Sequence, residues 1–168
     1  MIQINIVKST WNIVVWIIFI IALMFAILFF VPRIFKIYPY IVTSGSMEPK
    51  YKVNSVIYVK KVAPEQVKVG DAISFYLSND IVATHEVYKI DKKGKLFYTR
   101  GINNKDQDGN ILNDANPVSF DKLVGKPIYT IPHLGAVNKF VTEKPNRYYF
   151  IGVIVFSLLV EILLERKD

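Results

Sequence analysis

An uncharged apolar run over residues 11–31 places the strongest constraint on how this chain can fold. As a helix rising about 1.5 Å per residue, the run would reach roughly 30 Å, the thickness of the hydrocarbon core of a bilayer. A buried core helix rarely keeps so long a run free of charge, and no small-residue cleavage site of a removable signal peptide follows it. The sequence therefore predicts a transmembrane anchor over 11–31, preceded by a short N-terminal flank over 1–10.

A second apolar stretch lies near the C-terminal end. It begins with Tyr148 and Tyr149 and ends beside Arg166 and Lys167, and such residues suit the two interfaces of a membrane. We predict a second transmembrane helix over 148–165 and a tail over 166–168. The alternative is a C-terminal helix that lies in the membrane interface or packs on the domain.

The excess positive charge of the chain lies between the two apolar runs. The formal net charge is +7 at pH 7, and residues 33–147 hold 18 basic and 11 acidic residues. Nucleic-acid binding is not expected, because the basic residues are scattered and come with no aromatic stacking motif. Attraction to anionic lipid headgroups and a plain solvated basic face are the two interpretations that remain. The chain contains no cysteine, which excludes disulfides and thiolate chemistry.

The region 32–147 has the patterns of short β-strands joined by turns. Runs rich in β-branched and aromatic residues predict strands over 55–60, 71–77, 81–90, 96–99 and 123–131, and residues 41–43 lead into the next motif. Turns are expected at 78–80 and 91–94, and the polar stretch 101–117 predicts a loop. Pro127 indicates an edge or a bulge, and a short helix is expected before the second apolar run. The sequence thus predicts an all-β domain, either a small antiparallel β-barrel or a folded sheet.

The segment Thr43-Ser44-Gly45-Ser46-Met47-Glu48-Pro49 follows the first apolar run closely. A serine nucleophile must be exposed yet held in place, and it needs donors for the developing oxyanion. Gly45 allows the backbone to approach a substrate closely. Ser46 is therefore the candidate nucleophile, with its own N–H and the hydroxyl of Ser44 as candidate oxyanion donors.

A general base and an orienting acid are needed beside such a serine. The chain has two histidines, and His85 lies in a predicted strand, whereas His133 lies in a turn and is given no catalytic role. A carboxylate commonly orients an imidazole base through its second nitrogen. The polar stretch offers Asp108 and, as an alternative, Asp106; sequence order does not choose between them.

No metal site is expected from the sequence. Two isolated histidines without cysteine give no ligand spacing for zinc. The stretch 106–110 faintly resembles a calcium loop, but Ala115 stands where such a loop needs a glutamate, and we reject that interpretation.

These motifs together resemble signal peptidase I of the endoplasmic-reticulum type, the Ser-His branch of peptidase family S26, which also occurs in archaea and some Gram-positive bacteria. The resemblance covers roughly residues 41–135 and the anchor. The stretch 44–49 matches the nucleophile box, 69–75 resembles the Gly-Asp/Glu strand box, and 83–87 matches the box where this branch carries His and the bacterial branch carries a Lys base. The stretch 101–108 resembles the Gly-Asp-Asn-Asn…Asp box, so the catalytic aspartate of the family falls on Asp108.

Two positions depart from the family pattern. Ile102 stands where the last box has its first Asp, and Asn54-Ser55 stands where many members have a Gly-Asp pair. The first departure leaves Asp106 and Asp108 as the acids of that box.

The resemblance implies a membrane-bound serine endopeptidase that uses no cofactor. It would remove signal peptides from secretory preproteins after small residues, at the membrane surface and in proximity to the Sec translocon. Lys8, Arg33 and Lys36 would place the domain in the cytoplasm by a simple charge count. We follow the ordered motifs instead and expect the domain on the extracytoplasmic face of the cell membrane, or of the endoplasmic-reticulum membrane in a eukaryote.

Two other functions remain open at this point. One is a catalytically inactive, membrane-tethered β-domain that serves as a binding or scaffold module, which the missing acid at Ile102 favours. The other is a membrane serine protease with substrates outside secretion.

Overall fold

The computed structural model describes residues 2–78, 81–144 and 146–165. The chain divides into two compact units, one formed by Met1–Val31 with Val137–Asp168 and the other by Pro32–Ala136. Residues 79 and 80 of the predicted turn and the predicted tail over 166–168 lie outside the described residues.

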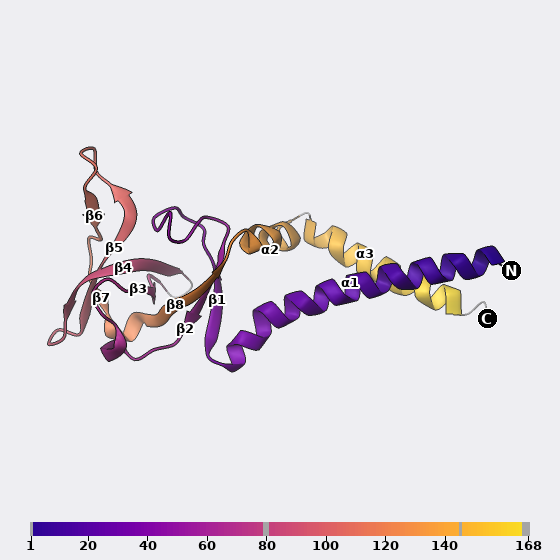
Figure 1. Cartoon of the computed structure of the whole chain (residues 1–168), viewed down its shortest axis with the longest axis horizontal. Helices are drawn as coiled ribbons and strands as arrows, with labels where there is room; N and C mark the ends of the chain where they lie inside the picture. Colours follow the sequence, from indigo (N-terminus) through magenta and orange to yellow (C-terminus); the bar gives the residue numbers. More distant parts are fainter. Residues whose placement is uncertain (1, 79–80, 145, 166–168) are drawn as a thin grey trace. The chain divides into compact units, whose positions relative to one another are not determined.

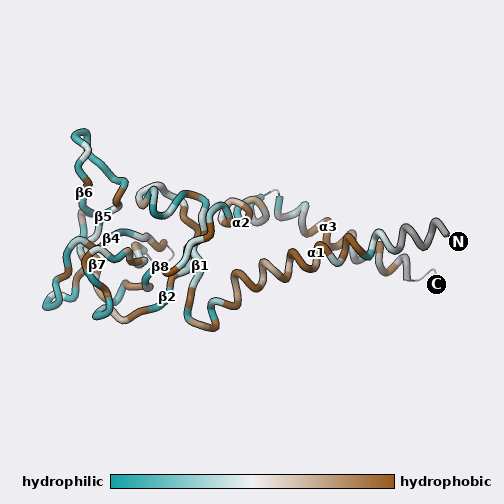
Figure 2. Tube along the Cα trace, in the orientation of Figure 1, coloured by the Kyte–Doolittle hydropathy of each residue, from teal (hydrophilic) through white to brown (hydrophobic). Residues whose placement is uncertain are grey.

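The first unit is helical. Helix α1 spans Ile2–Ile34, and its segment Ser9–Ile34 has the length and composition of a membrane span, which includes the predicted anchor. Apolar side chains along this segment are exposed, and Figure 2 colours the stretch brown. Exposed apolar surface of this extent is costly in water and suits lipid. Helix α3, Asn146–Glu165, covers the second apolar run, and its crossing of a membrane stays a prediction.

The second unit is built on one antiparallel sheet (Figure 1). Its strands are β1 (Ile37–Ile41), β2 (Val56–Lys60), β3 (Ala72–Tyr76), β4 (Val82–Asp91), β5 (Leu96–Lys105), β6 (Ile111–Asn113), β7 (Val118–Ser119) and β8 (Leu123–Ile131). Short 3-10 helices occupy Pro64–Gln66 and Phe120–Lys122, and helix α2, Leu134–Thr142, follows β8. The order along the sheet is β1-β2-β8-β3-β4-β5-β6, and β7 pairs with β5. The predicted all-β antiparallel fold is confirmed as a curled half-barrel.

Strand β8 joins the two halves of this sheet. Its C-terminal part pairs with β2, and its N-terminal part pairs with β3, where Gly125 faces Ser74. A Cβ at Gly125 would collide with the carbonyl oxygen of Lys60, so only glycine fits where the strands converge. The register shifts beside Pro127, which confirms the predicted bulge; β8 is an inner strand, so the edge alternative is wrong.

The buried side chains form two clusters. Met47, Ile57 and Val59 belong to the first cluster, and Ile73 and Phe97 belong to the second. Full burial of such side chains contributes about 1.5–3 kcal/mol each. Because Met47 is a core residue and follows Ser46 directly, the core itself fixes the loop that carries the candidate nucleophile.

The predicted loop over 101–117 is wrong in part. Strand β5 continues to Lys105, and Ile111–Asn113 returns as β6, so the stretch forms a hairpin that projects from the sheet (Figure 1). Its residues are largely polar and exposed, so they carry no alternation of buried and exposed side chains. Strand β1 over 37–41 was also not predicted as a separate strand.

Candidate active site

The motif 43–49 lies in the loop between β1 and β2, and hydrogen bonds within the loop hold its shape. The N–H of Glu48 donates to the carbonyl oxygen of Gly45 at 3.0 Å, and the N–H of Tyr51 donates to that of Met47 at 3.0 Å. The Glu48 carboxylate accepts a further hydrogen bond from the N–H of Val53 at 3.1 Å. Ser46 is therefore presented on a tight, internally bonded turn and not on a flexible one.

Strand β5 is hydrogen-bonded to the same loop through Asn103. Asn103 donates from its backbone N–H to the carbonyl oxygen of Ser46 at 2.8 Å and from Nδ2 to that of Gly45 at 3.0 Å. At Gly101, an added Cβ would come within 3.0 Å of the Ser46 Cβ and closer still to the Asn104 amide. The glycine and the asparagine of this box thus have a direct packing role beside Ser46.

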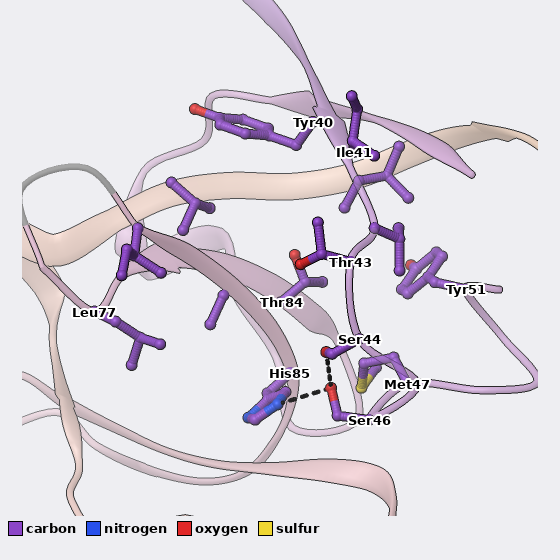
Figure 3. A pocket seen from close by; sticks show the side chains of 15 residues that line it. Tyr40, Ile41, Thr43, Ser44, Ser46, Met47, Tyr51, Leu77, Thr84 and His85 are labelled. Atoms are coloured by element: carbon purple, nitrogen blue, oxygen red, sulfur yellow. Dashed lines mark hydrogen bonds between the residues drawn. The ribbon is translucent and has the colours of Figure 1, made fainter. Parts of the chain in front are cut away.

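His85 lies in β4 and faces Ser46. Its Nε2 is 3.2 Å from the Ser46 Oγ, which is the reach of a hydrogen bond between a nucleophile and its base (Figure 3). The imidazole packs edge-on against the buried ring of Phe75, with 6.2 Å between ring centroids. Only 16% of its side-chain surface is exposed, so packing limits the orientations open to the ring.

The second ring nitrogen of His85 is bonded to Asp114. Nδ1 lies 2.6 Å from the Asp114 Oδ2, and the Thr99 hydroxyl donates to the same oxygen at 2.6 Å. Burial acts to raise the pKa of Asp114, but the hydrogen bonds from His85 and Thr99 outweigh it and hold that pKa below its usual range. Asp114 is therefore an ionised acceptor at neutral pH, and this keeps the proton of a neutral imidazole on Nδ1 and leaves Nε2 free to accept one.

Asp108 and Asp106, the acids expected from the sequence, are not bonded to His85. They lie in the turn of the β5–β6 hairpin, where Asp106 accepts from the N–H groups of Asp108 at 3.0 Å and of Asn110 at 2.8 Å. These bonds lower the pKa of Asp106 and give it the ordinary role of an aspartate in a turn.

The sequence analysis does not single out Asp114, because it predicts a loop and not a hairpin over 101–117. Once β5 and β6 pair, the chain returns to the base of the hairpin, and the N–H of Asp114 donates to the carbonyl oxygen of Thr99 at 2.9 Å. The returning strand Ile111-Leu112-Asn113 places the next residue, Asp114, beside β5, which in turn pairs with β4, the strand that carries His85.

Ser44 and a pocket complete the surroundings of Ser46. The Ser44 Oγ lies 3.3 Å from the Ser46 Oγ, within hydrogen-bond distance (Figure 3). A pocket of about 280 Å³ opens beside them, between the segment that leads out of β1 and the first residues of β4. Apolar side chains dominate its lining, among them Met47, Ile57 and Ala83. Such a pocket suits a small apolar group next to the hydroxyl of Ser46.

Ile102 and Asn54, which depart from the family pattern, have structural explanations, and nothing in the structure explains Ser55. Ile102 is partly buried and packs against the core cluster that contains Met47, so an apolar side chain is well accommodated there. Asn54 has φ +65°, a left-handed conformation that glycine adopts freely and asparagine tolerates better than most residues. Neither substitution disturbs the bonds around His85.

Asp71 of the Gly-Asp strand box has a structural partner. Its carboxylate accepts from the Lys126 Nζ at 2.6 Å and from the N–H of Lys68 at 2.8 Å. Burial acts to raise the pKa of Asp71, but these bonds and the charge of Lys126 prevail and lower it. The pair ties the start of β3 to β8.

His133 and the acidic side chains form no further site among the described residues. His133 lies in the turn that joins β8 to α2, with φ +62°. Within the described ranges, no three His, Asp or Glu side chains come together as a metal ion would require.

Comparison with known proteins places these features in context. The family model described as signal peptidase, peptidase S26, matches residues 11–108. The chain is similar to signal peptidase I W of Bacillus subtilis, with 37% identity over 78 residues that cover 45% of this chain and 41% of that protein. It is also similar to the signal peptidase complex catalytic subunit SEC11C of Rattus norvegicus, with 24% identity over 76% of this chain and 68% of that protein. A third relative, the putative signal peptidase complex catalytic subunit SEC11B of Homo sapiens, is 26% identical over 77% of this chain and 79% of its own length.

Proposed function

The chain belongs to the signal peptidase family, peptidase S26, and we propose that it is a membrane-anchored serine endopeptidase that removes signal peptides from secretory preproteins. The observation that carries this proposal is the continuous chain of contacts from the Ser46 Oγ through His85 to the Asp114 carboxylate. Serine, imidazole and carboxylate in this order are the parts that acyl transfer requires, whatever fold presents them.

Ser46 acts as the nucleophile and His85 as the general base in this mechanism. The Ser46 Oγ forms a bond to the scissile carbonyl carbon while its proton moves to the His85 Nε2, and the carbonyl electron pair moves onto oxygen. The tetrahedral intermediate then collapses, the C–N bond breaks, and the leaving amine takes the proton from Nε2. A water molecule hydrolyses the Ser46 ester by the same route and regenerates the hydroxyl.

Asp114 and Ser44 support the charges that develop. Asp114 holds the Nδ1 proton and stabilises the imidazolium that forms when Nε2 is protonated. Ser44 and the N–H of Ser46 donate to the oxyanion of the tetrahedral intermediate. The 3.3 Å between the two hydroxyl oxygens supports this role for Ser44, because a carbonyl attacked by Ser46 must lie next to both.

The pocket beside Ser46 supports a preference for small residues at the cleavage point. Its volume of about 280 Å³ lies at the lower end of ligand pockets and is lined largely by apolar groups. We expect the signal peptide to bind in extended form, as an added strand, with small side chains directed into this pocket.

The first helix supports a membrane location. The segment Ser9–Ile34 ends 12 residues before Ser46, and this short connection would keep Ser46 near the membrane surface. We expect the β-unit on the extracytoplasmic face, where the cleavage point of a translocated preprotein emerges. Proximity to the Sec translocon, and the identity of the preproteins, stay predictions.

A non-catalytic scaffold is the second candidate function. Its support in the sequence was the acid missing at Ile102, and that residue packs in the core while Asp114 serves as the partner of His85. The scaffold function therefore loses the observation that favoured it.

The test is cleavage of a model preprotein in membranes by the intact chain and by Ser46→Ala. Ser55→Ala is the matched control, because the Ser55 hydroxyl is buried and has no hydrogen-bond partner among the described residues. We expect processing by the parent and by Ser55→Ala and none by Ser46→Ala. Equal processing by Ser46→Ala would overturn the proposal. Failure of a serine-directed acylating probe to label the parent would favour the scaffold, and cleavage confined to proteins without signal peptides would favour a different protease.

A further inference from the structure

Thr99 is a buried residue of β5 that touches the His85–Asp114 pair from the side opposite Ser46. We infer that Thr99 is a positioning residue, which holds the Asp114 carboxylate in the orientation that His85 needs during catalysis. This inference rests on the function proposed above, and it adds to Ser46, His85 and Asp114 a fourth residue that no sequence motif singled out.

Thr99 holds Asp114 at two points. Its hydroxyl donates to the Asp114 Oδ2 at 2.6 Å, and its carbonyl oxygen accepts from the Asp114 N–H at 2.9 Å. The backbone hydrogen bond fixes the main chain of Asp114, and the side-chain hydrogen bond fixes the position of its carboxylate. The oxygen that receives the Thr99 proton is the same one that receives Nδ1–H of His85, so a shift of either donor changes the other bond.

Burial makes the hydroxyl difficult to replace. Thr99 is 1% exposed, and it pairs across the sheet with Val87, which lies two residues from His85 in β4. Very little of Thr99 is therefore open to water, and loss of the donor would leave the carboxylate with one protein partner fewer in a partly buried place. A hydrogen bond to a charged group is among the stronger ones in proteins.

The Thr99 hydroxyl also affects the protonation of Asp114. A cleft of about 330 Å³ reaches Asp114, and the titratable side chains that line it besides Asp114 are Tyr76, His85 and Lys122. Donation by Thr99 is one of the causes that keep the pKa of Asp114 low against burial. Without it the carboxylate would take up a proton at higher pH and would then no longer stabilise the imidazolium.

Thr99 is separate from the pocket expected to receive substrate. The described residues that line that pocket come from 40–57 and 77–85, and Thr99 is not one of them. Its loss should therefore act on the chemical step and leave substrate binding largely unchanged.

The experiment measures kcat, KM and the pH profile of preprotein cleavage by the full chain in detergent micelles, for the parent, Thr99→Val and Thr99→Ser. Thr99→Val keeps the shape and removes the hydroxyl, and we expect kcat to fall roughly ten- to a hundredfold with KM changed less than about twofold. The acidic limb of the profile should move to higher pH. Thr99→Ser restores the donor and should recover most of kcat and the parental profile.

Ser74→Ala is the matched control, because Ser74 is also fully buried and its hydroxyl lies 2.7 Å from that of Thr84, away from Asp114. It should lower the melting temperature and leave the pH profile unchanged. Parental kcat and profile in Thr99→Val, equal damage in Thr99→Ser, or the same displaced limb in Ser74→Ala would each overturn the role of Thr99.

Two further results, a variant that does not fold and a parent that is inactive, also decide between the hypotheses. If Thr99→Val does not fold, Thr99→Cys replaces it, since a thiol is a weak donor: an intermediate kcat with a displaced limb supports the role, and a parental profile overturns it. A parent that leaves the preprotein uncut overturns the proposed function and the role of Thr99 with it, whereas an active parent matched by Thr99→Val overturns only the role of Thr99.

Discussion

The backbone N–H of Asn103 donates to the carbonyl oxygen of Ser46 at 2.8 Å, so the strand that leads toward Asp114 also holds the residue with the candidate nucleophile. The side-chain amide of Asn103 adds a second bond, to Gly45 at 3.0 Å. Through these contacts β5 is linked to both ends of the Ser46–His85–Asp114 arrangement, since Thr99 of the same strand holds Asp114.

Asn103→Ala should slow cleavage without abolishing it. The backbone bond to Ser46 remains, and the lost amide bond is an exposed one worth about 0.5–1.5 kcal/mol, so we expect kcat to fall about two- to tenfold. Steady-state cleavage of a model preprotein measures the effect. Asn110→Ala is the control, because it removes an exposed amide that, among the described residues, is bonded to Asp106 in the hairpin turn. Equal losses in the two variants would mean that the hairpin as a whole, and not the clamp on Ser46, is affected.

Asp114→Asn should be far more damaging than Asp108→Asn. An amide in place of the carboxylate removes the charge and favours the wrong tautomer of His85, and such a change in a serine triad costs roughly 10⁴-fold in kcat. Asp108 and Asp106 lie in the hairpin turn, and their asparagine variants should keep nearly parental rates. Parallel cleavage assays of the three variants decide the matter; a severe loss in Asp108→Asn with an active Asp114→Asn would return the role to the acid expected from the sequence.

Ser44→Ala tests the oxyanion donor. Removal of one donor from an oxyanion site costs about 10²- to 10³-fold in kcat, and KM should change little, because the bond forms only as the carbonyl oxygen becomes charged. Thr43→Val provides the comparison, since Thr43 lines the same pocket and has no bond to Ser46 among the described contacts. We expect Thr43→Val to alter KM more than kcat. A kcat for Ser44→Ala within a few-fold of the parent would remove Ser44 from the oxyanion site.

Asp71→Asn should make the stability of the β-unit less dependent on acid. The folded state lowers the pKa of Asp71 below its unfolded value of about 3.9, so the stabilisation is complete above that pH and is lost as the pH falls through the folded pKa. At neutral pH the variant should lose about 1 kcal/mol, because the pair with Lys126 is only partly buried. The difference from the parent should shrink below about pH 4.

Thermal unfolding of the full chain in detergent, followed by circular dichroism from pH 3 to pH 7, measures this dependence. A cycle with Lys126→Met and the double variant isolates the coupling between the two side chains. A constant difference between parent and Asp71→Asn across the whole range would contradict the role of the ionised pair.

The central strands could be predicted from the sequence because their buried side chains leave a clear pattern. Val56 to Val59 form an apolar run buried in β2, and Ile73 and Phe75 alternate in β3 with small or polar neighbours. The outer elements lack this signal. The residues from Asn103 to Lys105 are polar and exposed, and pairing partners decide their strand conformation, so a local pattern of residues does not reveal it.

The candidate site divides in the same way. Ser46 and His85 each stand within a short, continuous motif that can be recognised from neighbouring residues. In the structure their side chains lie within hydrogen-bond distance of each other. The acidic partner of His85 is harder to identify from sequence. A hairpin can lengthen the chain between the motif at 101–108 and this acid while the acid keeps the same position in space. Asp114 lies at the base of that hairpin, and only the pairing of β5 with β6 brings it beside Thr99.

The position of β8 has a consequence for when activity can arise during synthesis. Ser46 comes from the β1–β2 half of the sheet, and His85 and Asp114 come from the β3–β4–β5 half, while β8 pairs with both. A nascent chain that has reached residue 122 already holds all three residues but lacks the strand that joins their halves. We therefore expect the three side chains to come together only when β8 is present, and a chain truncated after residue 122 should be inert toward a serine-directed probe.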